Sequence, residues 1–240
     1  MDEDSAEKVN RGRLKHQKQK EEESSEPATP SEVFQSYEYF QMEILVSDIT
    51  EEFEAEITKR ISRQVKILEA TPEDCDRLVY LHNRAFLSAT DPYSPINYDD
   101  MMMVLNFREN IVLIASLWGE DAGFIILGFD FYPGLDPETE GSDVPDGPAI
   151  APVRDGHSVY NVGYISGLGV DPRWQRRGIG TTLGITSWRY FKARNLTKLK
   201  CEVYAKNDAS YNLISGLGFK RVGSTTYTLE QQRAEPLRRL

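Results

Sequence analysis

Residues 164–191 constrain the fold more than any other stretch of this sequence, because an apolar segment with strand character there leads to Arg176 and Arg177. Gly178 and Gly180 follow, and a helix-like pattern begins directly after them. Glycine tolerates unusual dihedral angles and lets a ligand approach the main chain closely, while the N–H groups at a helix start favour a phosphate. Arginine adds donors that match phosphate oxygens. The stretch therefore predicts a strand, a phosphate-binding turn and a helix, and with them a nucleotide-type ligand.

Two familiar nucleotide-binding patterns fit this turn poorly. A phosphate-binding loop of the NTPase kind needs a lysine and then Ser or Thr after its last glycine, whereas Gly180 is followed by Thr181 and Thr182. A dinucleotide-binding fingerprint needs an acid about 20 residues on, at the end of the next strand. Glu202 lies inside the expected strand 198–204 instead. An ordinary strand–turn–helix with surface arginines remains the plain alternative.

Residues 170–180, which read VDPRWQRRGIG, resemble the acetyl-coenzyme A signature of the GNAT superfamily of N-acetyltransferases. A second block follows at the expected distance: residues 198–203 are similar to the fifth strand of that family, and residues 207–219 to its Asn…Leu-Gly-Phe block. The resemblance covers about residues 65–227. It implies an α/β chain of the α+β type, with one GNAT-like domain in which helices flank a twisted mixed sheet.

The resemblance also implies which residues bind the cofactor. The family uses acetyl-CoA as co-substrate, and the splayed end of its fourth strand faces the pantetheine arm and the acetyl group. The turn and the start of the next helix face the pyrophosphate. The cofactor-binding residues expected on this basis are Leu168, Gly169, Val170, Gln175, Arg176, Arg177, Gly178, Ile179, Gly180, Thr181 and Asn207.

Acetyl transfer to an amine needs a base, because an ammonium has no lone pair and a primary amine has an unperturbed pKa of about 10.4. Tyr164 and Glu202 lie on strands expected to be adjacent, and we expect both to face the thioester as catalytic residues. Residues 164–170 are similar to the fourth strand of certain protein N-terminal acetyltransferases, in which the tyrosine position takes part in deprotonation. A half-buried strand aromatic and a solvent-facing acid are the alternative interpretations.

Two further tyrosines and the position of Ile214 complete the expected site. Many family members carry a tyrosine that protonates the leaving thiolate, but Ile214 stands at that position. Tyr211, Ser210 or water could substitute, or the thiolate could leave unaided, and Tyr211 is the catalytic residue expected here. Residues 95–100 are similar to the loop whose tyrosine contacts the peptide in the N-terminal acetyltransferases, which makes Tyr98 an expected acceptor contact. Tyr227, in the last expected strand, is the second expected acceptor contact.

Composition limits the partners and the compartment. The formal net charge of −10 argues against a basic nucleic-acid-binding surface and fits a cationic partner such as an amine better. The cysteines, Cys75 and Cys201, and the histidines, His16, His82 and His157, show neither a disulfide framework nor metal-ligand spacing, so we expect no metal. No apolar run approaches the ~20 residues that span a bilayer. We therefore expect a cytoplasmic protein without membrane association.

Three segments differ in character from the rest of the expected domain at residues 65–240. Residues 1–30 are charged and nearly free of large apolar side chains, which predicts a disordered tail. Residues 31–64 hold apolar side chains and a helical pattern at 48–63, so we expect an extra helix or hairpin packed on the core, or a dimer contact. The acidic, proline-rich insertion at 133–157 is either a flap over the amine site or a solvated loop.

Hydrophobic periodicity predicts alternating strands and helices within the domain. The expected helices begin at residue 71, within 92–105, directly after residue 180 and near residue 208. The expected strands are 65–68, 111–117, 123–130, 158–170, 198–204 and 219–229.

These observations favour an N-acetyltransferase that moves an acetyl group from acetyl-CoA to a primary amine by direct attack in a ternary complex. The acceptor is either a protein N-terminus or a small amine. The alternative is a catalytically weak acyl-CoA-binding module with a regulatory or interaction role, which Ile214 and the long N-terminal extension favour. A homodimer is compatible with both interpretations.

Overall fold

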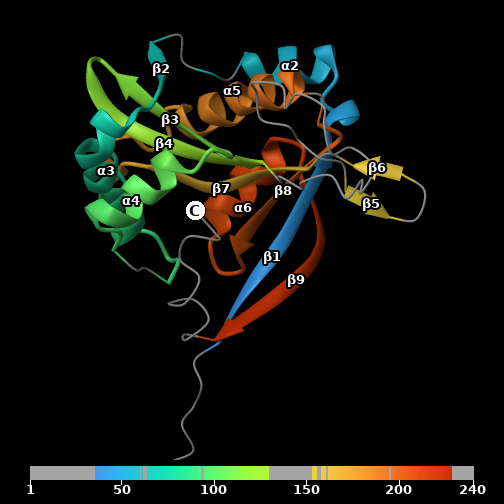
Figure 1. Ribbon diagram of the computed structural model, residues 1–240. Coiled ribbons are helices and arrows are strands. Elements are labelled where there is room, and N and C mark those ends of the chain that lie inside the picture. The colour runs from blue at the N-terminus through green and yellow to red at the C-terminus, as the bar shows by residue number, and fades with distance from the viewer. Residues whose placement is uncertain are drawn as a thin grey trace, which may run out of the picture. The chain divides into compact units, whose positions relative to one another are not determined.

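The computed structural model describes residues 36–59, 61, 64–92, 95–129, 153–155, 158–160, 162–194 and 196–228. In this part of the chain, seven strands form one sheet in the order β2-β3-β4-β7-β8-β1-β9 (Figure 1). These strands are β1 (Ser36–Leu45), β2 (Val65–Glu69), β3 (Asn110–Leu117), β4 (Glu120–Phe129), β7 (Val162–Val170), β8 (Lys198–Tyr204) and β9 (Lys220–Thr228). A separate two-stranded sheet consists of β5 (Val153–Asp155) and β6 (Ser158–Tyr160).

The large sheet is mixed, because its neighbouring strands run antiparallel except for β7 and β8, which are parallel. A parallel pair needs a crossover connection, which the turn after β7 and the helix α5 supply. The α-helices of the described residues are α2 (Glu51–Thr58), α3 (Cys75–Leu87), α4 (Tyr98–Asn106), α5 (Ile179–Ala193) and α6 (Asp208–Gly216). Short 3₁₀ turns are η1 (Val46–Asp48), η2 (Pro72–Asp74) and η3 (Pro172–Trp174). The mixed sheet with flanking helices confirms the predicted fold class.

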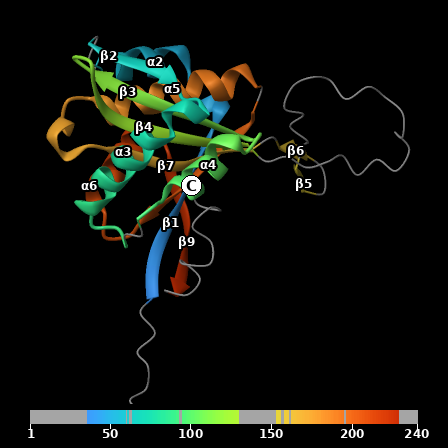
Figure 2. The ribbon, with the colours of Figure 1, turned by 60° about the vertical axis from the view of Figure 1, so that its left-hand side comes forward.

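Alternation of side chains along the strands divides the interior into two apolar clusters, one on each face of the sheet. Helices α3 and α4 cover one face and α2 and α5 cover the other, as Figures 1 and 2 show. The cluster under α3 and α4 includes Ile114, Phe124 and Ile126. The cluster under α5 includes Leu113, Ile125, Leu127 and Trp188.

Residues 36–45 differ from the expected extra helix or hairpin, because they form a strand of the main sheet. β1 lies between β8 and β9 and runs antiparallel to both. Met42 and Ile44, two residues apart on one face of the strand, are buried. β1 therefore joins the two strands that carry Glu202 and Tyr227. Helix α2 is shorter than the expected helix at 48–63 and begins after Thr50, whose hydroxyl accepts a hydrogen bond from the N–H of Phe53 at 3.2 Å.

The expected strand 158–170 is divided in the structure. Residues 158–160 pair with 153–155, and the strand of the main sheet begins at Val162. The predicted tail at 1–30 and most of the acidic insertion, residues 133–152 and 156–157, lie outside the described residues. Among the helices that the structure describes, none is both long enough and apolar enough to cross a membrane.

Candidate active site

β7 and β8 are paired only over the first part of each strand. Their ladder ends where Ile165 lies opposite Cys201. Beyond that point β7 continues along β4 to Val170, whereas β8 continues along β1 to Tyr204. The sheet therefore opens between the two strand ends, and backbone groups of β7 that face the opening are available to a ligand.

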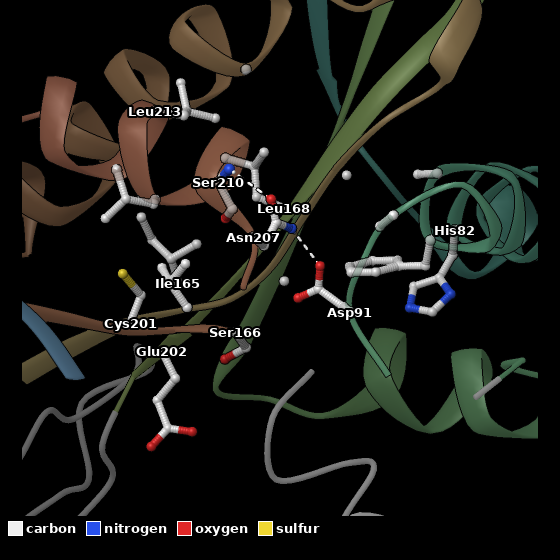
Figure 3. Close-up of a pocket in the computed structure, with 18 of the residues that line it drawn as sticks. His82, Asp91, Ile165, Ser166, Leu168, Cys201, Glu202, Asn207, Ser210 and Leu213 are labelled. Carbon is white, nitrogen blue, oxygen red and sulfur yellow. Dashed lines mark hydrogen bonds between the residues drawn. The ribbon is translucent and has the colours of Figure 1, made fainter. Parts of the chain in front are cut away.

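β7 carries a bulge at Ser166, beside this opening. Against β4, Gly167 lies opposite Ile126 and Ile165 lies opposite Leu127, which leaves Ser166 without an opposite residue. A bulge increases the local twist and re-aims the groups of the extra residue, and bulges are frequent next to active sites. Ser166 lines the cleft that occupies the opening (Figure 3).

The cleft has a volume of about 1740 Å³. Its lining comes from β1, the end of α3 and the segment after it, part of α4, β7 and the turn after it, the starts of α5 and α6, and β8. Arg177, Tyr98 and Tyr211 are absent from its described lining. The residues predicted from the sequence that line it are Tyr164, Leu168, Gly169, Val170, Gln175, Arg176, Gly178, Ile179, Gly180, Thr181, Glu202, Asn207 and Tyr227.

The turn after β7 and the first residues of α5 line the cleft. Arg176 and Gly178 have φ values of 62° and 76°, and such left-handed residues curl a backbone into a concave nest of N–H groups. Gly178 is the N-cap of α5, and its carbonyl accepts hydrogen bonds from the N–H and the Oγ1 of Thr182, both at 2.9 Å. The N–H groups of the first helical turn have no partner within the helix. Together with the helix dipole they form a site suited to an anion.

The two arginines of the turn occupy different surroundings. The guanidinium of Arg177 lies over the rings of Trp118 and Trp174, 5.3 and 5.2 Å from their centroids. Arg176 lines the cleft and its side chain is exposed. The sequence predicts the same role for both residues, whereas the structure brings only Arg176 to the cleft.

Asp171, which the sequence analysis did not single out, anchors the start of the turn. Its side chain is fully buried, and its Oδ2 lies 2.8 Å from Nε of Arg84 and 3.0 Å from Nη2 of Arg173. Burial by itself raises the pKa of Asp171, but the hydrogen bonds and charge of Arg173 and the charge of Arg84 outweigh it, so this pKa lies below its ordinary value. The turn is thereby tied to α3. The sequence shows no signal of this contact, because Arg84 lies far from Asp171 along the chain.

Glu202 and Tyr227 meet across β1. The hydroxyl of Tyr227 donates one hydrogen bond that is shared by Oε1 and Oε2 of Glu202, which lie 2.9 and 3.1 Å from the hydroxyl oxygen. The ring of Tyr39 on β1 packs against Tyr227 with its centroid 5.7 Å away. Tyr164 lines the cleft from β7 and lies opposite Lys200 in the parallel ladder. The structure thus brings Tyr164, Glu202 and Tyr227 to one cleft, with aromatic rings at its β1 side.

Two other predicted tyrosines lie elsewhere. Tyr211 packs edge-on against Phe40, with 5.7 Å between the ring centroids, on the side of α6 that faces the core. Ile214 stands at the position where the family resemblance implies a tyrosine, and it is 3% exposed. Tyr98 is the first residue of α4 and is 49% exposed.

Asp91 is a cleft residue that the sequence analysis missed. It follows α3, and it accepts a hydrogen bond from Nδ2 of Asn207 (Figure 3). Burial raises the pKa of Asp91, and hydrogen bonds from Asn207 and from its own backbone partly oppose this. His82 also lines the cleft, and burial lowers its pKa to about 4, so its imidazole is neutral at neutral pH. In the sequence, Asp91 stands in a polar loop without any distinguishing pattern.

The profile of the acetyltransferase (GNAT) family matches residues 78–219 of the chain. The matched span includes β7, the turn that follows it, α5, β8 and α6. The chain belongs to this family. Members of the family are acetyltransferases that use acetyl-CoA as co-substrate, so the match confirms the family and the enzyme class predicted from the sequence.

Individual relatives resemble the chain more distantly. A mycothiol acetyltransferase of Acidothermus cellulolyticus is 36% identical over 69 residues, and the match covers 29% of this chain and only 21% of that protein. A mutant of the BH1408 protein of Bacillus halodurans superimposes with a TM-score of 0.53 at 18% identity, over 67% of this chain and 96% of that chain. An aminoglycoside acetyltransferase from an uncultured soil metagenomic sample, solved with sisomicin, gives a TM-score of 0.46 at 17% identity, over 64% and 87% of the two chains. The likeness to the Bacillus structure shows the fold.

Proposed function

We propose that the protein is an N-acetyltransferase that moves the acetyl group of acetyl-CoA to a primary amine by direct attack within a ternary complex. One observation carries this proposal: a single cleft holds both the opening between β7 and β8 and the N–H-rich turn at the start of α5. The opening offers strand backbone to the amide groups of a pantetheine arm, and the turn offers N–H groups to a pyrophosphate. Coenzyme A carries these two groups in that order.

The proposed cofactor contacts follow the lining of the cleft. The pantetheine arm runs beside residues 168–170, and the pyrophosphate accepts hydrogen bonds from N–H groups of residues 178–181. Gln175 and Arg176 lie at the same turn, and Asn207 lies at the start of α6. Backbone N–H groups of β7 beside the Ser166 bulge are placed to stabilise the oxyanion that forms at the thioester carbonyl.

The reaction also has to move two protons from the acceptor. An ammonium must lose the first proton before its nitrogen can attack the thioester carbon. The attacking nitrogen releases the second proton when the C–N bond has formed and the C–S bond breaks. Tyr211 would have to leave its contact with Phe40 to reach the leaving thiolate. We therefore propose that the thiolate takes the second proton, directly or through water.

The acceptor is proposed to be a protein N-terminus or a small amine that enters from the side of β1 and α4. Tyr227 and Glu202 line this side of the cleft, and exposed Tyr98 lies at the start of α4, where a longer acceptor would pass. The net charge of −10 favours a cationic acceptor over an anionic one.

A screen of amines and of peptides with free N-termini, with acetyl-CoA as donor and mass detection of the product, tests this function. A product heavier than the acceptor by one acetyl group is the expected result. The alternative, a catalytically weak acyl-CoA-binding module, is favoured by the apolar Ile214. Calorimetric binding of acetyl-CoA without any acetylated product would support that alternative, and absence of binding would contradict both.

The two arginines of the turn are expected to differ in their effect on the cofactor. Arg176→Ala should raise the KM for acetyl-CoA about tenfold, because a charge-assisted contact to phosphate contributes about 1.5–3 kcal/mol. Arg177→Ala removes the same charge from the neighbouring position, and its guanidinium lies over Trp118 and Trp174 rather than at the cleft. We expect its KM to stay within about twofold of wild type. Equal effects in the two variants would contradict this assignment.

A further inference from the structure

A carboxyl group reaches the cleft from the segment that follows α3. Asp91 lines the cleft that Ser166 and Leu168 also line, and Figure 3 shows its carboxyl group directed toward Asn207. The neighbouring Thr90 donates a hydrogen bond from Oγ1 to the carbonyl of Lys206 at 3.4 Å. The segment is therefore tied to the loop between β8 and α6, beside the opening of the sheet.

Asn207 holds one oxygen of this carboxyl group in a fixed direction. Its Oδ1 caps α6 by accepting a hydrogen bond from the N–H of Ser210 at 2.9 Å, which turns its NH₂ group toward Asp91. Nδ2 donates to Oδ2 of Asp91. The other carboxyl oxygen is directed away from Asn207 (Figure 3). Burial raises the pKa of Asp91, and a carboxylate with a raised pKa accepts a proton more readily than an ordinary aspartate.

Other titratable groups line the same cleft as Asp91, among them Glu43, Arg176 and Lys200. His82 on α3 is a neutral imidazole at neutral pH because burial lowers its pKa to about 4. Glu202 on β8 accepts the hydrogen bond of the Tyr227 hydroxyl. Asp100 on α4 and Tyr164 on β7 line the same cleft. The pKa of Asp91 is set by burial and hydrogen bonds rather than by a neighbouring charge.

We propose that Asp91 is the general base of the acetyl transfer, an inference that rests on the function proposed above. Its carboxylate takes one proton from the ammonium of the acceptor, and the freed nitrogen lone pair attacks the thioester carbon. The C–N bond forms, the C–S bond breaks, and the thiolate takes the second proton from the nitrogen. The proton on Asp91 then passes to solvent, which restores the carboxylate. Glu202 and Tyr164, the bases predicted from the sequence, bind the acceptor in this scheme.

Asp91→Asn tests the proposal, because asparagine keeps the shape and an oxygen that accepts from Asn207 but removes the base. The probe is the amine that gives most product in the acceptor screen, and kcat/KM is measured from about pH 6 to about pH 9. At neutral pH the variant should lose about 100-fold or more in kcat/KM. The ratio of wild-type to variant kcat/KM should shrink as the pH rises. At higher pH a larger fraction of the amine is already neutral, and a neutral amine needs no base. Calorimetry should show unchanged affinity for acetyl-CoA, which confirms that the variant is folded.

Glu202→Gln and Tyr164→Phe are the matched controls, because each removes a competing base from the same cleft. Both should lower kcat/KM less than Asp91→Asn does, and by a factor that stays constant with pH. A pH-dependent loss in either control would move the role to that residue and overturn the proposal. A constant deficit in Asp91→Asn would show a merely structural role and overturn it as well. If wild type acetylates no amine, the proposed function fails and this inference with it, whereas an active Asp91→Asn variant refutes only the inference.

Discussion

Replacing Asp171 with alanine is expected to lower the free energy of unfolding by about 2–3 kcal/mol, because it removes the hydrogen bonds and ion pairs of a buried carboxylate, whereas both arginine partners stay partly in contact with solvent. Asp171 is fully buried, and its carboxylate contacts both Arg84 and Arg173. The substitution removes the ion-pair partner of Arg84, which lies on α3, and the acceptor of the N–H of Arg173, which donates to Oδ1 of Asp171 at 2.9 Å. Urea denaturation followed by tryptophan fluorescence measures the change.

Glu120→Ala is the matched control for this prediction. Glu120 pairs with the same Arg173 at 3.4 Å, but the two side chains are 59% and 49% exposed. Exposed ion pairs contribute little, so this variant should stay within about 1 kcal/mol of wild type. A loss as large as that of Asp171→Ala would show that burial is not the cause.

The stabilisation by Asp171 should also depend on pH in a defined direction. Because the folded state lowers the pKa of Asp171, the stabilisation is complete above the ordinary aspartate pKa of about 3.9. It is lost as the pH falls through the lower folded-state value. The difference in unfolding free energy between wild type and Asp171→Asn should therefore be constant near neutrality and shrink in acid.

Replacing Gly178 with valine is expected to lower the affinity for acetyl-CoA about 100-fold. Gly178 has a φ of 76°, and a β-branched residue in this left-handed region is strained by ~1–2 kcal/mol. The turn should relax to a negative φ and turn its N–H groups away from the cleft. Loss of about two charge-assisted hydrogen bonds to phosphate corresponds to about 3 kcal/mol. Calorimetric titration with acetyl-CoA measures the affinity.

Gly119→Val separates strain from cofactor binding. Gly119 has a φ of 86°, and a Cβ added there would meet no atom within 4 Å. It lies at the turn between β3 and β4, outside the described lining of the cleft. We expect Gly119→Val to lower the free energy of unfolding about as much as Gly178→Val does. Its affinity for acetyl-CoA should stay unchanged. Comparable weakening of cofactor binding in both glycine variants would refute the role given to the turn.

Several elements were predictable from the sequence because their signals are local. The strand that ends at Val170, the turn with its glycines and the helix that follows are encoded by periodicity and by residues within a few positions of each other. The strands that carry Tyr164 and Glu202 were expected to be adjacent, and β7 and β8 do pair. Both residues line one cleft, and their catalytic role stays a prediction. The role of residues 36–45 was not predictable, because a strand pattern does not specify which edges it pairs with.

The sequence alone determined the strand–turn–helix unit that suits a phosphate and the family to which the chain belongs. Only the tertiary structure separated Arg176, at the cleft, from Arg177, which lies over two indole rings. Only it brought Asp91 against Asn207 and Asp171 against Arg84. The physical reason is the range of the interactions: dihedral preferences and side-chain periodicity act between near neighbours in the chain. Burial, ion pairs and hydrogen bonds between distant segments exist only once the sheet and its helices have packed.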